Sequence, residues 1–369
     1  MPRVGFPRVR RVATAAIVIA TALIVVGCYG RGAASTAARS GAAVGVIPAG
    51  QFTSLHVAGA LAVAPDGALY VVDVTRDRIL VRSPDGRFRV VAGNGTTGFA
   101  GDGGPAVRAE LSGISALAVA RSGTLYIADA GRVRAVGRDG VIRTIAGDGR
   151  AARPLASGAP GTITSGTPAP SASLGSRWSI EHRGAPLSVA LNREGQLYVS
   201  TSSQILRLTD TGRLDVVRAI VPSGPAAGPL NSIGSIAVTA RGDVDVGGLE
   251  LGWSIWRVTP NGVAREVGYA RCCDGRTATV ETAPNGVGYG ESGAAILRIT
   301  SRKLVPAFSF VTNVNGQYFS PGYFAFGPTG TIYVDDIPGN TGFEAHQQLL
   351  SVSAGRLRLL WQEDNAAPK

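Results

Sequence analysis

Large apolar residues alternate with small or polar residues through most of the chain after about residue 59. A period of two is typical of half-buried β-strands, whereas an amphipathic helix repeats every three to four residues. Glycine-containing turns interrupt the alternation every 8–10 residues. In the first unit the pattern predicts four strands, named a to d, at residues 61–64, 69–72, 79–82 and 87–91.

The four-strand pattern recurs six times, and each unit is marked by a turn glycine. An alanine lies five residues before this glycine in five of the six units, and a tyrosine such as Tyr126 lies three residues after it in five. Repeated four-stranded meanders form the blades of a β-propeller. The sequence therefore predicts an all-β, six-bladed β-propeller over residues 51–369, with the alanine on the crowded inner strand and the tyrosine packed between blades. The turn glycines are Gly67, Gly123, Gly195, Gly242, Gly286 and Gly330.

A glycine-rich insert follows the first unit. Residues 90–106 have the sequence VVAGNGTTGFAGDGGPA, and together with the strand segments 69–73 and 125–129 they resemble the bacterial NHL-repeat family. The resemblance is strong over residues 59–149 and stays in phase over 187–362. It implies a propeller fold and a role similar to that of the exported NHL-type sensor domains attached to some bacterial kinases. A second copy of the insert begins at residue 145 and gives way to a Gly/Pro/Ser-rich stretch at about 149–186.

The long insertions all fall at one end of the strands. Because successive strands reverse direction, the b–c and d–a connections share one face, and elaborated loops on a rigid scaffold commonly bind. We expect this face to hold a partner through Asn94, Phe99 and Asp102, and we expect replacement of residues 96–110 by a short link to leave stability nearly unchanged. The alternatives are that the inserts are solvated spacers or a brace between blades. The insertions are 93–114, 149–186, 219–233 and 269–276.

Three aspartates, Asp73, Asp129 and Asp336, occupy one repeat position at the end of strand b and are included as candidate binding residues. Each carboxylate could accept hydrogen bonds from the b–c turn. The resemblance to six-bladed lactonases implies a second interpretation, a carboxylate ring that holds calcium. A hard cation needs six or more oxygens, and the other three units offer Thr201, Gly248 and Ser292, so no metal site is predicted.

Catalytic motifs are sparse. His56, His182 and His346 show no spacing related to the repeat, although the related peptide-amidating lyases bind zinc through histidines. We find no nucleophile elbow, P-loop or dinucleotide fingerprint, because the glycine run precedes no helix. No catalytic residue and no cofactor is therefore assigned, and enzymatic activity is left open.

The amino terminus predicts export. Four arginines and no acid precede an uncharged, mostly apolar run at residues 12–26, which has the length of a secretory signal rather than of a membrane span. The run ends in Val-Val-Gly-Cys28, which resembles a bacterial lipobox. We predict a signal peptide at 1–27, lipidation of Cys28, and a flexible tether at 28–50, although residues 43–58 could also add a strand. An ordinary signal peptide and an uncleaved anchor are the alternatives.

Cys272 and Cys273 are adjacent, and in an oxidising compartment they have only each other once Cys28 is lipidated. A strained vicinal disulfide, two free thiols and an intermolecular bridge all fit.

Composition excludes a disordered chain, since 45% of residues are hydrophobic and 17% are charged. Removing residues 1–27, with four arginines and no acid, lowers the net charge from +11 to +7. In an exported protein this charge favours anionic lipids or acidic envelope polymers over nucleic acid. The sequence thus predicts a lipid-anchored propeller on the outer face of the bacterial cytoplasmic membrane, within the cell envelope, that binds a protein or glycan. The alternative is a metal-dependent enzyme similar to the lactonase or lyase propellers.

Overall fold

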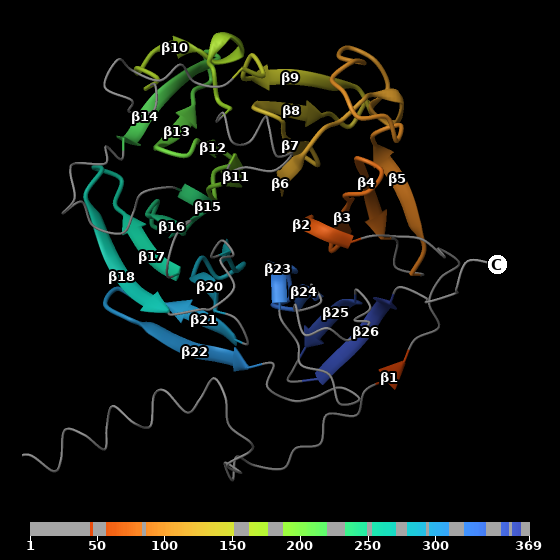
Figure 1. Ribbon diagram of the computed structural model, residues 1–369. Coiled ribbons are helices and arrows are strands. Elements are labelled where there is room, and N and C mark those ends of the chain that lie inside the picture. The colour runs from red at the N-terminus through yellow and green to blue at the C-terminus, as the bar shows by residue number, and fades with distance from the viewer. Residues whose placement is uncertain are drawn as a thin grey trace, which may run out of the picture. The chain divides into compact units, whose positions relative to one another are not determined.

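The alternating segments form β-strands throughout the computed structural model, and residues 42–369 make up a unit of their own. Within the described residues, the helical segments are two 3-10 turns, η2 (Ala106–Arg108) and η3 (Ala169–Ser171). The strands form six antiparallel sheets arranged as a ring (Figure 1). The prediction of an all-β, six-bladed propeller is confirmed. The structure describes residues 45–46, 57–82, 86–150, 162–175, 187–219, 233–248, 253–270, 279–292, 295–309, 321–336, 348–353 and 356–362.

Each blade is a four-stranded meander with its first strand nearest the ring axis. Blades 1 and 2 are β2 (Val57–Val63), β3 (Leu69–Asp73), β4 (Arg78–Arg82) and β5 (Phe88–Ala92), then β6 (Ile114–Val119), β7 (Leu125–Asp129), β8 (Arg132–Val136) and β9 (Ile142–Ala146). Blades 3 and 4 are β11 (Ser188–Leu191), β12 (Leu197–Ser200), β13 (Gln204–Leu208) and β14 (Arg213–Ala219), then β15 (Ile233–Val238), β16 (Val244–Gly248), β17 (Trp253–Val258) and β18 (Ala264–Ala270). Blades 5 and 6 are β19 (Val280–Thr282), β20 (Gly288–Ser292), β21 (Ala295–Ile299) and β22 (Leu304–Ser309), then β23 (Pro321–Phe326), β24 (Ile332–Asp336), β25 (Gln348–Ser353) and β26 (Arg356–Gln362).

The six turn glycines have a common conformation, with φ between 77° and 90°. Residues with a Cβ rarely adopt this region, so the turn requires glycine. In every unit the glycine N–H donates to the carbonyl three residues earlier, as Gly67 does to Ala64 at 2.9 Å. The sequence repeat is therefore a repeat of one tight turn between the first two strands of each blade.

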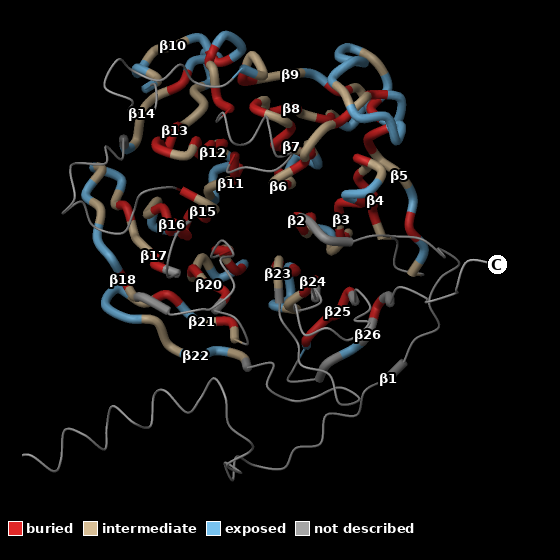
Figure 2. Tube along the Cα trace, in the orientation of Figure 1, coloured by how far each residue is buried: buried red, intermediate tan, exposed pale blue. Residues whose placement is uncertain are grey.

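The core lies between blades, because alternate residues of a strand face opposite neighbours. On the inner strand of blade 1, Leu61 packs toward blade 6, whereas Ala62 packs toward blade 2. Tyr126 packs against the cluster between blades 2 and 3, as predicted. Buried residues accordingly follow the facing surfaces of the sheets (Figure 2).

Side-chain hydroxyl groups connect the inner strands of successive blades from blade 2 to blade 6. Each bridges to a main-chain group of the next inner strand, or of the residue directly before it, so it satisfies backbone groups that face another sheet. The four bonds are Ser115 Oγ to the Leu187 oxygen (2.6 Å), Ile236 N to Ser188 Oγ (3.2 Å), Val280 N to Ser235 Oγ (2.9 Å) and Thr279 Oγ1 to the Gly322 oxygen (3.0 Å).

The ring closes through packing between blades 6 and 1, and blade 6 keeps its own outer strand. Strand β1 (Gly45–Val46) adds a fifth, parallel strand to the outer edge of β26, with Gly45 opposite Arg358. Two residues of the predicted tether at 28–50 thus pair with a sheet, within the segment 43–58 that could add a strand.

Several sequence predictions fall on residues that the structure does not describe. Cys28, the Cys272–Cys273 pair and the three histidines all lie outside the described residues. Among the residues that are described, no helix is long and apolar enough to cross a membrane.

Candidate functional site

The glycine-rich insert runs along the outer edge of blade 2. Gly103 N donates to the Ile142 oxygen (2.8 Å), Ile142 N donates to the Gly104 oxygen (3.0 Å), and Ala106 N donates to the Gly140 oxygen (2.8 Å). Gly140 belongs to the turn between β8 and β9, so the insert lies beside this turn and the beginning of β9 (Figure 1). The insert therefore pairs with part of an edge strand that would otherwise expose unpaired backbone groups.

The insert also fills the space between blades 1 and 2. Ala106, Ala109 and Leu111 have exposed fractions of 1%, 0% and 0%. They pack in one cluster with Ile79 and Ala92 of blade 1 and with residues of blade 2. The expectation that residues 96–110 could be replaced without loss of stability does not fit these contacts. Of the alternatives, the brace between blades describes this insert.

The described residues 147–150 and 162–175 repeat the arrangement between blades 2 and 3. Gly147 N donates to the Ala169 oxygen (2.8 Å), just as Gly93 N donates to the Ala106 oxygen (3.0 Å). Strand β10 (Thr167–Pro168) then pairs with β14 at the outer edge of blade 3. The described part of the predicted Gly/Pro/Ser-rich insert at 149–186 therefore contains a second brace. Its signal was present in the sequence, because the motif Pro-Ala-x-x-Ala-x-Leu occurs at both 105–111 and 168–174.

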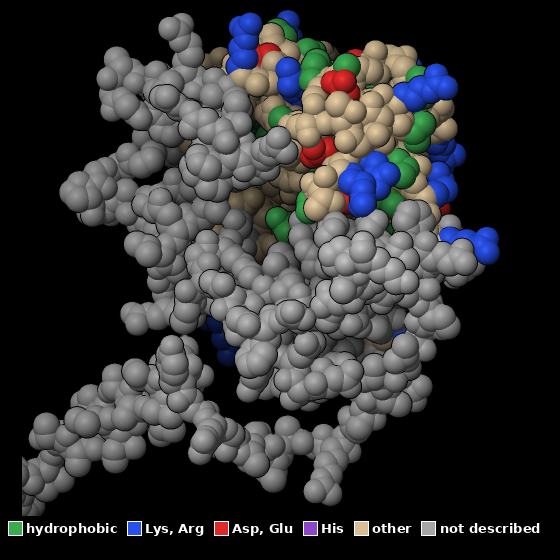
Figure 3. Space-filling view, turned by 45° about the vertical axis from the view of Figure 1, so that its right-hand side comes forward, with side chains coloured by type: hydrophobic (Ala, Val, Ile, Leu, Met, Phe, Trp, Pro, Cys, Tyr) green, Lys and Arg blue, Asp and Glu red, His purple; other side chains and the backbone are tan. Residues whose placement is uncertain are grey.

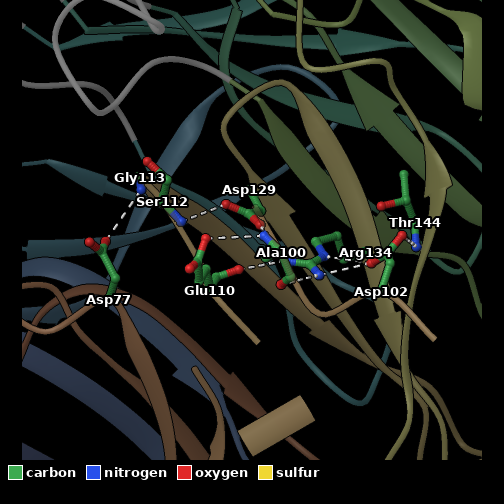
Figure 4. A network of polar contacts seen from close by, with 9 residues as sticks. All are labelled: Asp77, Ala100, Asp102, Glu110, Ser112, Gly113, Asp129, Arg134 and Thr144. Atoms are coloured by element: carbon green, nitrogen blue, oxygen red, sulfur yellow. Dashed lines mark hydrogen bonds and ion pairs between the residues drawn. The ribbon is translucent and has the colours of Figure 1, made fainter. Parts of the chain in front are cut away.

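A buried arginine, Arg134, joins the first insert to blade 2 (Figure 4). Its guanidinium donates to the main-chain oxygen of Glu110 (2.6 Å) and to two carboxylates, Asp129 Oδ2 (3.2 Å) and Asp102 Oδ1 (2.8 Å). Its side chain has an exposed fraction of 0%. Strand register places Leu80 and Leu206 at the equivalent positions of blades 1 and 3. Sequence analysis missed Arg134, although an arginine at a position that is leucine in other blades is a readable signal.

Of the three aspartates at the end of strand b, the two with described side chains, Asp73 and Asp129, are buried rather than exposed to solvent. Asp73 accepts from Arg78 Nη2 (2.8 Å) and from Thr75 Oγ1 (3.0 Å), and Asp129 accepts from Ser112 N (2.8 Å) in addition to Arg134. Both are at or below 1% exposure. Asp336 ends β24 at the equivalent position, but its side chain lies outside the described residues. The two described carboxylates thus hold local structure, and a role in binding stays a prediction for all three.

The two carboxylates on Arg134 differ in pKa. Burial raises the pKa of Asp129 to about 6 against the hydrogen bonds from Ser112 and Arg134. Burial also opposes ionisation of Asp102, but hydrogen bonds from Thr144 and Arg134 outweigh it and lower its pKa. Asp102 therefore remains ionised in a pH range where Asp129 takes up a proton.

Phe99 is the exposed aromatic side chain of the first insert, with 39% of its surface accessible. The Arg132 guanidinium carbon lies 3.5 Å from the centroid of its ring, which is a close cation–π contact. Arg132 Nη2 also donates to the main-chain oxygen of Asp148 (3.0 Å). The Arg132 guanidinium occupies the space where a side chain at Gly149 would lie. Arg132 thus ties the first insert to the second and holds Phe99 in place.

The other two predicted binding residues of the insert use their side chains for hydrogen bonds within the protein. Asn94 Oδ1 accepts from Thr96 N (2.7 Å), and Asn94 Nδ2 donates to the Arg108 oxygen (3.2 Å). Asp102 Oδ2 accepts from Thr144 N (2.8 Å). Figure 3 shows basic and apolar side chains side by side on the described part of the face that carries blades 1 and 2. Phe99 is therefore the strongest contact candidate, with Asn94 and Asp102 shaping the loop around it.

A family model of the teneurin NHL domain matches residues 80–240. This match and the six blades fit an NHL-repeat propeller. Within the described part of the propeller, no group of three or more His, Cys, Asp or Glu side chains is placed to hold a metal ion.

Several solved structures are similar to this chain. The propeller is similar to a streptogramin B lyase, with 13% identity over 82% of this chain and 81% of that chain and a TM-score of 0.49. It is also similar to a virginiamycin B lyase from Staphylococcus aureus, with 12% identity over 82% of this chain and 83% of that chain and a TM-score of 0.47. A PQQ-bound aldose sugar dehydrogenase from Streptomyces coelicolor is similar with 14% identity over 81% of this chain and 94% of that chain and a TM-score of 0.47. At these identities the similarities assign no activity to this chain.

Proposed function

We propose that this protein is a lipid-anchored propeller of the bacterial cell envelope that binds a protein or glycan partner at the surface around Phe99. The observation that carries the proposal is the half-exposed Phe99 ring, which Arg132 and the braced insert hold in one position. Aromatic side chains are the commonest anchors of binding surfaces, because they offer a large contact area with few rotatable bonds.

The rigidity of the insert supports the same proposal. Its backbone is bonded to β9, and its apolar residues are buried between two blades. A group that is already ordered loses little conformational entropy when a partner binds. Three of the four exposed large apolar side chains among the described residues, Val74, Phe99 and Val107, belong to the first insert or to the blade 1 turn beside it. Contact area is thus concentrated on one side of the ring.

The anchor is argued from the sequence. The basic segment, the apolar run and Cys28 support export and lipidation, and the Gly/Ala/Ser-rich residues that follow would separate the propeller from the lipid. Two acyl chains on one cysteine suffice for stable membrane attachment. In this arrangement the propeller lies on the outer side of the cytoplasmic membrane.

The test is a photo-crosslinking amino acid placed at Phe99 in the intact, membrane-attached protein. Val263 is the matched control, because it is exposed and apolar but lies in the β17–β18 turn of blade 4. The proposal predicts a discrete adduct from position 99 and none from position 263. Equal labelling at both positions, or no adduct at position 99, would contradict it.

A further inference from the structure

Asp129 connects three parts of the braced region. Its Oδ1 accepts from Ser112 N at the end of the first insert, and its Oδ2 accepts from Arg134. A two-residue turn, Ala130 and Gly131 with φ of 42° and 79°, separates it from Arg132, the residue opposite it in the β7–β8 ladder. One carboxylate therefore acts on both arginines that hold the Phe99 insert.

The charged groups around Asp129 come from every element packed against it. Strand β8 supplies Arg132 and Arg134, the first insert supplies Asp102, and the second insert supplies Asp148, while Glu110 contributes its main-chain oxygen as an acceptor for Arg134. Asp77, in the turn of blade 1, accepts from Thr97 Oγ1 (2.7 Å) and from Gly113 N (3.4 Å) and fixes both ends of the first insert.

Protonation of Asp129 changes this balance. With Asp129 ionised, Arg134 has two carboxylates, and Arg132 is attracted to the negative charge beside its turn. With Asp129 neutral, Arg134 keeps Asp102, while Arg132 loses its attraction to Asp129 and keeps the weaker attractions to Asp148 and Asp102. Phe99 lies 3.5 Å from Arg132 and 5.1 Å from Arg134, so a shift of either guanidinium reaches its ring.

We propose that proton uptake by Asp129 loosens Arg132 and Arg134 and repositions Phe99, so that the Phe99 surface responds to acidity. The value of about 6 for the pKa of Asp129 sets the pH range, and the lowered pKa of Asp102 keeps the second carboxylate out of it. Only the use of this switch in partner binding rests on the proposed function; the movement itself belongs to the free protein.

The experiment follows the carboxyl carbon of Asp129 and the ring of Phe99 by NMR in the full-length protein, from about pH 4 to about pH 8. Both signals are expected to shift with one midpoint near 6. In Asp129→Asn, which resembles the protonated acid in shape and charge, the Phe99 ring signal is expected to stop responding to pH. Asp139→Asn is the control, because Asp139 is an exposed acid of the same blade that pairs with Arg143, and it should leave the Phe99 titration unchanged.

A Phe99 titration that persists in Asp129→Asn would overturn the proposal, as would an Asp129 titration that leaves the Phe99 signal unmoved. If Asp129→Asn does not fold, Arg134→Leu provides the test, because leucine is the residue of blades 1 and 3 at this position. Without its cation Asp129 should take up its proton at higher pH, and an unchanged midpoint would count against the switch. A shared titration without crosslinking at position 99 would support the switch and reject the binding site.

Discussion

At the scale of single residues, Glu281 is the clearest exception to the repeat. It occupies the inner-strand position that is alanine in the other five units, and it lies opposite Tyr289 on the face of blade 5 that packs against blade 6. Burial raises its pKa from 4.5 to about 8. The folded protein therefore holds a proton at neutral pH that the unfolded chain releases.

This proton makes stability depend on pH. The folded-state pKa is raised, so the stabilising contribution is complete below about pH 4.5 and is lost as pH rises through about 8. Glu281→Ala, which restores the repeat residue, should remove a loss of about 3–5 kcal/mol between these limits. Urea unfolding of both proteins across this range measures the difference, with exposed Glu266→Ala as the control. An identical pH slope in wild type and Glu281→Ala would show that Glu281 ionises freely in the fold.

At the scale of elements, the two inserts act as braces that fill the gaps between blades 1 and 2 and between blades 2 and 3. Leu111 and Leu174 occupy equivalent places in the two gaps and are almost completely buried. Blades diverge away from the ring axis, so their outer strands leave apolar surface that a further segment has to cover.

Truncation of the first brace should therefore destabilise the ring. Leu111→Ala is expected to cost about 2–5 kcal/mol in the free energy of unfolding, because a buried leucine leaves a cavity. Val107→Ala is the matched control, since Val107 lies in the same insert but is 48% exposed, and it should change stability by less than about 0.5 kcal/mol. Equal effects of the two substitutions in denaturant unfolding would mean that the insert is a solvated loop after all.

The sequence predicted the blades well and the braces poorly, for a physical reason. Blade strands are set by local rules, namely a period of two and a glycine with positive φ, and local rules are visible in the sequence. The braces depend on contacts distant in the chain, such as that of Asp102 with Arg134, and on a motif at 168–174 displaced by a longer loop. A glycine-rich loop is commonly expected to be exposed to solvent. In the first insert the glycines instead allow the chain to approach neighbouring backbone closely, as at Gly93, which lies against the backbone of Asp77 and Arg78.

At the scale of the whole molecule, six similar units close a ring by packing, while β1 adds a parallel strand to the outer edge of blade 6. If Cys28 is lipidated as proposed, residues 28–44 would join the lipid to β1. A connection this short would keep the propeller close to the membrane surface, where a partner in the envelope is within reach.

The anchor is tested by Cys28→Ala. Loss of the lipidated thiol should yield an uncleaved or soluble protein that no longer partitions into detergent, because the acyl chains supply the membrane affinity. Phase separation with Triton X-114, combined with the mass of the amino terminus, measures this. If the variant still enters the detergent phase at the processed mass, Cys28 is not the anchor.

The central claim is that the glycine-rich insert is a folded part of the propeller that holds Phe99 in place, and hydrogen exchange of its backbone amides tests this most directly. The N–H groups of Asn94, Gly98, Gly103 and Glu110 all donate to backbone oxygens in the structure. We predict that these amides exchange as slowly as those of β8 and β9, because they open only when blades 1 and 2 separate. Exchange at the rate of an unprotected peptide, while β8 and β9 stay protected, would contradict the account.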